Sequence, residues 1–254
     1  MSALVADTSI LARRAIVRSA RNPASIMSAV LFPLLFLGLF NLVMRRVMAA
    51  QGFDYAQLLP STVVIQAMMF AGMSAAYYVA DDRTTGMLSR LRSLPIHRAS
   101  PLLARTFADA ARSLLSIAVV VGVGVATGMR FTAGAAAAAG YVLVAVAFAV
   151  TMSLGMGLIG LVAPTRDSAA SLASIPYLPL IMLSSGFAPV DDFPGWLQPF
   201  VEWQPVTSAI DALRALAGDG DISTTVTRTV MWSVVLVLVF TAMSVRLTDR
   251  AVSR

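Results

Sequence analysis

Residues 133–162 form an uninterrupted run without a charged side chain, and several other runs in the chain are nearly as apolar. A helix needs about 20 predominantly apolar residues to cross a bilayer. Charged residues make up 13% of the whole chain, whereas soluble domains carry about a quarter. A membrane β-barrel would show short alternating segments in place of long runs. The sequence therefore predicts an all-α polytopic membrane protein.

The apolar runs predict six transmembrane helices. They cover residues 25–44, 58–80, 102–127, 133–162, 169–187 and 226–245. Six spans put both termini on the same side of the membrane. If that side is the cytoplasm, most of the 19 basic residues, all of them arginine, lie in inner segments, as the positive-inside rule requires. The same bias accounts for the net charge of +6, so we do not expect a nucleic-acid partner.

The chain is expected to form a single transmembrane domain, residues 1–254. Its parts are an N-terminal interfacial helix (1–24), two spans (25–80), a polar segment (81–100), three spans (101–187), two short outer helices (188–220), and a last span with a cytoplasmic tail (226–254). Near the N-terminus, Arg14, Arg18 and Arg21 form one stripe at helical spacing, with Ala12 roughly opposite. This pattern suits a helix on the inner leaflet with its arginines at the lipid phosphates.

A polar, arginine-rich island, residues 81–96, separates the second and third apolar runs. It is much longer than a turn at the membrane surface needs to be. When it is read as a helix, its apolar residues share one face: Met87, Leu88, Leu91 and Leu94. Asp81 and Asp82 stand where acids favour a helix N-terminus, and Pro95 closes the segment. The pattern predicts a short amphipathic helix on the cytoplasmic side that contacts a soluble partner.

The segment between the fifth and sixth predicted spans holds two helices that are too short and too polar to cross the membrane. Pro205 opens the second of them and Gly218 ends it. We expect a re-entrant or interfacial pair on the outer face. Its large aromatic side chains suit the membrane interface and predict a gate at the outer end. The expected gate residues are Phe193, Pro194, Trp196, Phe200, Trp203 and Pro205.

Several kinds of chemistry are excluded or disfavoured by composition. The chain has no lysine, so it cannot contain the Gly-Lys pair of a Walker A loop. It has no cysteine and a single histidine, His97, so disulfides, thiolate chemistry, catalytic dyads and metal sites are not expected. We also expect no ionisable side chain deep in a span, which disfavours a proton-driven antiporter. No catalytic residue, metal or cofactor is expected in this chain.

Two blocks resemble a known family. The block GMLSRLRSLPIHRASPLLAR (Gly86–Arg105) looks like the cytoplasmic coupling region of type-2 ATP-binding-cassette exporter permeases. The block SSGFAPVDDFPGWLQPFVEWQPVTSAIDALRALAGD (Ser184–Asp219) is similar to the segment that follows the fifth helix in that family. The FPGW-L-QPF…QP…ALRALAGD spacing is most similar to the daunorubicin-resistance type, an actinobacterial drug or lipid exporter subunit. Family coupling segments often carry a glutamate before the glycine, and here Asp81, Asp82, Thr84 and Thr85 stand there instead.

The resemblance implies the membrane subunit of an exporter in the cytoplasmic membrane of a bacterium. It implies a dimer with a second permease chain, identical or paralogous, surrounded by membrane lipids. Two separate ATPase subunits would bind ATP and Mg²⁺. The residues expected to couple to the ATPase are Asp82, Arg83, Gly86, Met87, Leu88, Leu91, Leu94 and Pro95.

The expected substrate is a hydrophobic or amphipathic compound that moves along the first, second and fifth spans. The residues expected to line this path are Gln66, Met69, Met73, Tyr77, Tyr177 and Ser184. Three alternatives stay open at this point: export of a polysaccharide or polyketide-linked envelope lipid by the same kind of permease, an intramembrane enzyme, and a non-transporting assembly factor.

Overall fold

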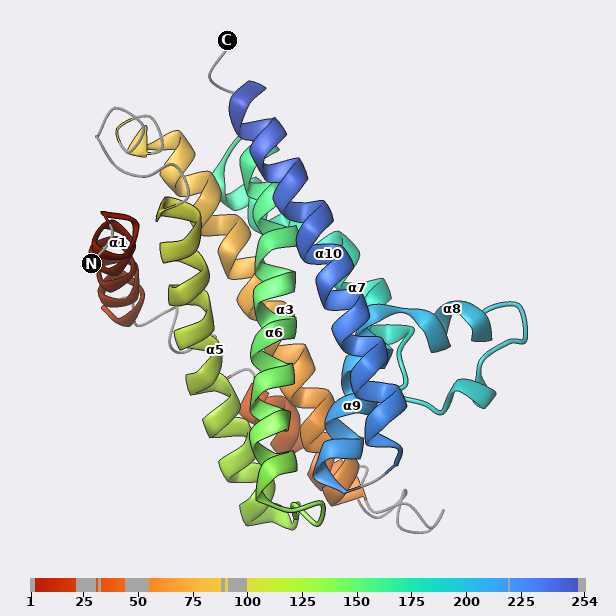
Figure 1. The fold of residues 1–254 in the computed structure, drawn as a ribbon. Helices are drawn as coiled ribbons and strands as arrows, with labels where there is room; N and C mark the ends of the chain where they lie inside the picture. The colour runs from red at the N-terminus through yellow and green to blue at the C-terminus, as the bar shows by residue number, and fades with distance from the viewer. Residues whose placement is uncertain are drawn as a thin grey trace.

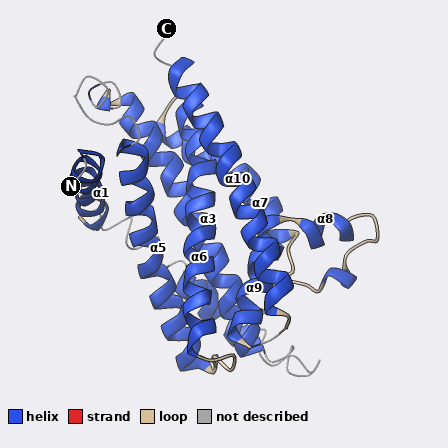
Figure 2. Ribbon diagram, viewed as in Figure 1, coloured by secondary structure: helices blue, strands red, loops and turns tan. Residues whose placement is uncertain are grey.

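The computed structural model describes residues 3–21, 31, 33–43, 55–87, 90, 100–218 and 220–250. Within these ranges the chain consists of helices and turns, with no β-strand (Figure 2). The elements are α1 (Ala3–Ala20), α3 (Tyr55–Thr84), α5 (Ser100–Thr127), α6 (Ala135–Val162), α7 (Arg166–Met182), the 3-10 helix η1 (Val190–Asp192), α8 (Gln198–Trp203), α9 (Pro205–Ala217) and α10 (Ile222–Arg250). A further apolar helix covers Pro33–Val43.

Helix α3 is the centre of the bundle (Figure 1). Helices α5, α6, α7 and α9 all pack against it, α10 packs against α6 and α9, and α1 lies beside α5. Along α3 the side chains of Val63, Val64 and Met68 are completely buried. Helix α10 instead exposes a row of aliphatic side chains that includes Val234 and Leu238, as expected for a helix in contact with lipid tails.

Glycines allow α3 and α6 to approach each other closely. A Cβ atom added to Gly72 of α3 would lie 3.1 Å from the carbonyl group of Met152. A Cβ atom added to Gly160 of α6 would lie 2.4 Å from the carbonyl oxygen of Ala76. Neither position can hold a side chain unless the helices separate. This is the small-residue packing that holds membrane helices together when both faces are apolar.

The bundle has two ends, which we name after one arginine at each. The Arg83 end holds the C-terminal ends of α3, α6 and α10 and the N-terminal ends of α5 and α7, and it lies at the top of Figure 1. The Arg214 end holds the N-terminal ends of α3, α6 and α10 and the C-terminal end of α9. The polar contacts that bear on function gather at these two ends.

The prediction of an all-α polytopic protein is confirmed. Four helices are long and apolar enough to span a membrane: α3, α5, α6 and α10. The predicted span 58–80 is longer in the structure, and so is 226–245. The latter begins earlier because the carboxylate of Asp221 accepts the backbone N–H groups of Ser223 and Thr224 at 2.9 and 3.4 Å, as an N-cap does.

The other two predicted spans differ from the structure. The predicted span 169–187 begins and ends too late, because α7 covers Arg166–Met182. Thr165 and Ser168 form a capping box that starts the helix earlier, and the chain turns after Met182. Within the predicted span 25–44, the structure describes residue 31 and residues 33–43, and the latter form the short helix Pro33–Val43. The count of six spans therefore stays a prediction.

The N-terminal helix is confirmed as α1. Thr8 and Ala12 are buried, and α1 packs against α5. Arg14 and Arg21 are exposed, which agrees with the predicted separation of the arginines from Ala12. The side chain of Arg18 lies outside the described part of the chain.

Candidate functional site

At the Arg83 end, helix α3 stops at a glycine. Gly86 has a φ of +70°, a conformation that favours glycine over any residue with a Cβ atom. The N–H groups of Thr85 and Gly86 donate to the carbonyls of Asp81 and Arg83 at 2.9 and 3.1 Å. The N–H of Arg90 then donates to the carbonyl of Gly86 at 3.1 Å. A new helical turn therefore begins directly after the glycine, in the predicted coupling segment.

The predicted coupling residues fall into two groups. Four are described: Asp82, Arg83, Gly86 and Met87. Four lie outside the described residues: Leu88, Leu91, Leu94 and Pro95. Met87 is partly buried, and its sulfur accepts from Nη1 of Arg14 at 3.5 Å. The N-terminal helix and the coupling segment therefore meet at this end.

Two aspartates precede Arg83 and both contact other helices. Oδ1 of Asp81, which is buried, lies 3.4 Å from Nη1 of Arg166 on α7. Oδ2 of Asp82 lies 3.7 Å from Nη1 of Arg105 on α5. Both acids thus have partners inside this chain, which sequence reasoning had not foreseen because the arginines are distant in sequence.

Arg83 contacts the end of a third helix. Its Nη1 donates to the carbonyl of Leu161 at 2.8 Å and its Nη2 to the carbonyl of Ala163 at 2.5 Å. The last carbonyls of a helix have no partner within it, and a cation stabilises the negative end of the helix dipole. Arg83 satisfies both requirements at the C-terminus of α6.

The side chains of two charged residues of α5, Asp109 and Arg112, are largely buried against α3. Asp109 is only 5% exposed, and its Oδ1 lies 2.7 Å from Nη2 of Arg112. The same nitrogen donates to the carbonyl of Ala71 at 3.3 Å, near the middle of α3, and the guanidinium lies 5.6 Å from the ring centre of Tyr78. The alignment of α5 with α3 thus brings the Arg112 guanidinium to the middle of α3. Burial within the protein does not measure depth in the membrane, so the expectation of no ionisable group deep in a span stays a prediction.

The predicted substrate-path residues lie mostly in the core of the single chain. Gln66 and Tyr177 are buried, and Nε2 of Gln66 lies 3.0 Å from the Tyr177 hydroxyl. Met69 and Ser184 are completely buried, whereas Met73 and Tyr77 are partly exposed. The structure brings Gln66 and Tyr177 together across α3 and α7. It does not test whether these six residues line a path.

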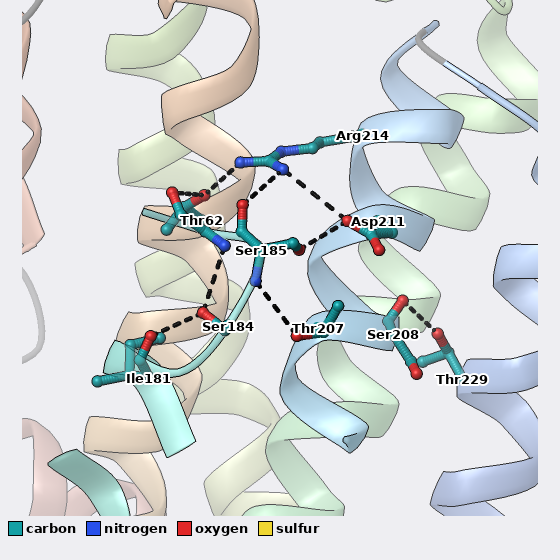
Figure 3. Close-up of polar contacts among 10 residues, drawn as sticks. Thr62, Ile181, Ser184, Ser185, Thr207, Ser208, Asp211, Arg214 and Thr229 are labelled. Carbon is teal, nitrogen blue, oxygen red and sulfur yellow. Dashed lines mark hydrogen bonds and ion pairs between the residues drawn. The ribbon is translucent and has the colours of Figure 1, made fainter. Parts of the chain in front are cut away.

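At the Arg214 end, one face of α9 carries four polar side chains. They are spaced at intervals of three, four and three residues, and we call them the polar stripe: Gln204, Thr207, Asp211 and Arg214. All four contact the turn 183–186, which follows α7, and Figure 3 shows the contacts of Thr207, Asp211 and Arg214. This spacing places the four side chains on one helix face. Sequence reasoning predicted the two ends of this helix, at Pro205 and Gly218, but not the stripe, and the spacing of the polar residues was the signal that could have revealed it.

The polar stripe satisfies four polar groups of that turn. The N–H of Ser185 donates to Oγ1 of Thr207 at 3.2 Å, and its hydroxyl donates to Oδ1 of Asp211 at 2.7 Å. The amide of Gln204 donates to the carbonyl of Leu183. Burial raises the pKa of Asp211, while the Ser185 hydroxyl and the charge of Arg214 act against that rise. The turn is therefore fastened to α9 through both backbone and side-chain atoms.

Arg214 connects the stripe to the central helix. Its Nη1 donates to the carbonyl of Ser185 at 2.9 Å, and its Nη2 donates to Oγ1 of Thr62 on α3 at 3.2 Å (Figure 3). On another side of α9, the hydroxyl of Thr229 on α10 donates to the carbonyl of Ser208 at 2.7 Å. Helix α9 is thus bound to α3, to α10 and to the end of α7.

The predicted gate residues lie on an arm that projects from the side of the bundle (Figure 1). Trp196 is 81% exposed, and Phe200 and Trp203 are about half-exposed. The guanidinium of Arg228 lies 4.8 Å from the ring centre of Trp203. Phe193 is partly buried, Pro194 is exposed and Pro205 is the first residue of α9. The gate function is not tested by these positions and stays a prediction.

Comparison with known proteins identifies the family. The model of the ABC-2 type transporter family matches residues 6–217. The chain is 29% identical to "Probable doxorubicin resistance ABC transporter permease protein DrrC" of Mycobacterium tuberculosis, over 90% of this chain and 83% of the relative. It is 27% identical to "Daunorubicin resistance ABC transporter permease protein DrrB1" of Streptomyces coeruleorubidus, over 80% and 72%. It is 30% identical to "Doxorubicin resistance ABC transporter permease protein DrrB" of M. tuberculosis, over 65% and 57%.

The family match covers most of the chain, including both blocks on which the resemblance rested and both ends of the bundle. The relatives are permease components, and the absence of lysine excludes a Walker A site here. The chain therefore belongs to the ABC-2 type transporter family, as a membrane permease subunit of an ABC transporter without an ATPase site of its own.

Proposed function

We propose that the chain is the permease of an ATP-driven exporter of hydrophobic or amphipathic compounds, with anthracycline-type drugs as the first class to test. The observation that carries this proposal is its similarity over most of its length to permeases named for doxorubicin and daunorubicin resistance. Two separate ATP-binding-cassette subunits would bind ATP and Mg²⁺ and supply the energy for transport. They would act on a dimer of permease chains in a bacterial cytoplasmic membrane.

Transport itself is measured with doxorubicin as the probe. The tagged permease is purified with the ATPase that accompanies it and reconstituted in phospholipid vesicles. We expect ATP-dependent movement of doxorubicin across the vesicle membrane. If the complex hydrolyses ATP but moves a lipid-linked saccharide and not the drug, the substrate is of the alternative class. Absence of any ATPase from the purified complex would contradict the proposal.

The coupling segment is the proposed contact with the ATPase. Helix α3 ends at Gly86 and a helical turn restarts at once, which is the local geometry that a separate docking helix requires. Replacing Leu88 and Leu91 by aspartate should release the ATPase while the permease stays folded in detergent. The measurement is the amount of ATPase that co-purifies. Unchanged assembly with unchanged ATP turnover would rule out this contact.

Six spans with both termini in the cytoplasm are the proposed topology. The helix Pro33–Val43 and α7 would belong to the two spans added to the four long apolar helices. The chain contains no cysteine, so single cysteines report position directly. Cysteines at Ser2, Ser89 and Ser253 should be protected from an impermeant reagent in intact cells. A cysteine at Gln51 should react, and labelling at position 89 would overturn this topology.

The arm that carries α8 is the proposed outer gate. Its exposed aromatic side chains and the prolines between them form a stiff surface beside the polar stripe. Replacing Trp196 and Trp203 by alanine should lower export of chemically different compounds by a similar factor, because a gate acts on every substrate. The measurement is export of several compounds in cells, with ATP hydrolysis in parallel. Loss of one compound alone would indicate a recognition site instead.

A further inference from the structure

Three consecutive residues at the end of α3 reach three different helices. Successive residues of an α-helix point about 100° apart. The side chains of Asp81, Asp82 and Arg83 therefore leave α3 in three different directions. They contact Arg166 at the start of α7, Arg105 on α5 and the last carbonyls of α6. The final turn of α3 is therefore fixed in rotation by its neighbours, three residues before Gly86.

Arg83 points into the bundle and not toward solvent or a docked subunit. Its two terminal nitrogens donate to Leu161 and Ala163, which flank the end of α6 at its connection to α7. Ala163 is only 1% exposed, so this contact is shielded from water. Planar, bidentate donation of this kind is specific to arginine, because a lysine ammonium is a single point charge.

The helices around this contact have no room to slide. At this end, α3, α6 and α7 meet through small or flexible side chains: Ala76, Ala80, Met156, Ala163, Ala169 and Ala173. The Cβ position of Gly160 is already blocked by the carbonyl of Ala76. Closely packed helices transmit displacement as rigid bodies, since interiors of this density are not continuously deformable.

We propose that Arg83 is a positioning residue that passes displacement of the coupling segment to the connection between α6 and α7. The inference rests on the proposed function, because it assumes that the coupling segment is moved by an ATPase. Any movement of the α3 terminus that left α6 and α7 behind would break both hydrogen bonds and leave buried carbonyls without partners. The three helices therefore move together, and the α6–α7 connection is driven through Arg83.

The first test separates positioning from a simple helix cap. The complex with its ATPase is reconstituted in vesicles as wild type, Arg83→Gln and Arg83→Lys, with Arg130→Gln as a control on an exposed arginine at the opposite end. ATP hydrolysis and doxorubicin movement are measured on the same vesicles. We expect doxorubicin moved per ATP to fall at least threefold in Arg83→Gln and by an intermediate factor in Arg83→Lys. The control should match wild type.

Two outcomes would overturn the inference. An unchanged ratio of doxorubicin to ATP in Arg83→Gln would show that Arg83 transmits nothing. A proportional loss of ATPase assembly, hydrolysis and transport would show that Arg83 only caps α6. If the wild-type complex itself moves no substrate, the proposed function has failed, and this result is distinct from both.

A second test does not depend on the folding of an Arg83 variant. Thr84 and Pro164 are exposed on either side of the contact, and the native chain has no cysteine. Cysteines at both positions are joined by a short bismaleimide in the otherwise wild-type permease. If the end of α3 and the α6–α7 connection move as one body, the cross-linked complex keeps at least half of its transport. Abolition of transport by the cross-link, but not by labelling of either cysteine alone, would overturn the inference.

Discussion

The two ends of α3 are held by different kinds of interaction. At the Arg83 end two ion pairs accompany the hydrogen bonds from Arg83 to backbone carbonyls, and the side chain of Arg166 in one of the ion pairs is 54% exposed. At the Arg214 end most contacts are hydrogen bonds between α9 and a buried turn, with Ser184 and Thr207 completely buried. Exposed ion pairs contribute little and exchange partners easily. Buried hydrogen bonds are costly to break because each leaves an unsatisfied group.

This difference indicates where the permease can change shape. The two ion pairs at the Arg83 end are partly open to water, because Arg166 is 54% exposed and Arg105 and Asp82 are 22% and 24% exposed, so they can exchange partners while the arginine-to-backbone contacts hold. The polar stripe has less freedom, because Gln204 and Thr207 are buried and the side chain of Arg214 is only 17% exposed, so water cannot readily replace the partners that they would lose. We therefore expect α9 and the end of α7 to move as one body, and the exposed arm with α8 to supply the movement at the Arg214 end.

The largest expected effect on stability concerns the buried ion pair between Asp109 and Arg112 on α5, which packs against α3. Arg112→Gln leaves Asp109 in a buried site without its cation, which costs about 3–5 kcal/mol in the free energy of unfolding. Arg166→Gln removes a partner of Asp81 that is 54% exposed, so water can reach the site in its place, but Asp81 itself is buried; this variant should cost less than Arg112→Gln, about 1–2 kcal/mol. Reversible unfolding in mixed detergent micelles measures both.

The double variant Asp109→Asn/Arg112→Gln is the control for this comparison. Since neither residue then carries a charge, the double variant should be more stable than Arg112→Gln alone. If Arg112→Gln and Arg166→Gln cost the same, burial does not decide the strength of the contacts at this end.

The next effect compares two arginines at the other end. Arg214→Gln removes the donors to Ser185 and Thr62 in a mostly buried site, and should cost about 1.5–3 kcal/mol. Arg228→Gln removes contacts with the exposed Trp203 and Glu202 and should cost at most about 1 kcal/mol. The same unfolding measurement applies. Equal costs would show that the polar stripe is no more tightly held than the exposed arm.

Two glycines that end helices give a smaller effect. Gly218 after α9 has a φ of +136°, and an added Cβ atom would overlap Oγ1 of Thr132. Gly86 after α3 has open space around it, and only its φ of +70° favours glycine. Gly86→Ala should therefore cost about 1 kcal/mol and Gly218→Ala about 2 kcal/mol. Gly218→Ala/Thr132→Ala, which removes the clashing hydroxyl, should recover part of this cost when it is compared with Thr132→Ala alone. The reverse order of costs for the two glycine variants would contradict the steric argument.

Much of the helical architecture could be predicted because it is encoded locally. Long apolar runs located α3, α5 and α6 to within a few residues, and Pro205 and Gly218 marked the ends of α9. The end of α7 was missed because the residues that stop it, Leu183 to Gly186, are held by side chains of α9 that are distant in sequence.

The candidate site was predicted less well than the fold. Arg83 was identified by position, but its partners are backbone carbonyls of α6, which no side-chain pattern reveals. The burial of Asp109 depends on which turns of α5 and α3 lie side by side. A single sequence does not reveal how two helices are aligned. Contacts within a helix were thus predictable, whereas contacts between helices were not.

The smallest expected effect is a pH dependence at the Arg214 end. Burial raises the pKa of Asp211 above its ordinary value of 3.8. The unfolded chain therefore releases this proton at lower pH than the folded chain, and the folded state loses stability as the pH rises from about 4 through the raised pKa. Asp211→Asn removes this titration. Its melting temperature relative to wild type should rise between pH 4 and pH 7, by less than about 3 °C because the carboxyl is partly exposed.

Asp221, the cap of α10, provides a control of opposite sign. Hydrogen bonds from Thr224 and Ser223 lower the pKa of its carboxyl, which is fully exposed. Its stabilisation is present above the ordinary pKa and is lost as the pH falls through the lowered one. Asp221→Asn should therefore fall below wild type at pH 7 and approach it at acid pH, while Asp211→Asn shows the reverse trend. If both variants follow the same trend in thermal unfolding scans between pH 3 and pH 7, burial of Asp211 within the polar stripe does not control its ionisation.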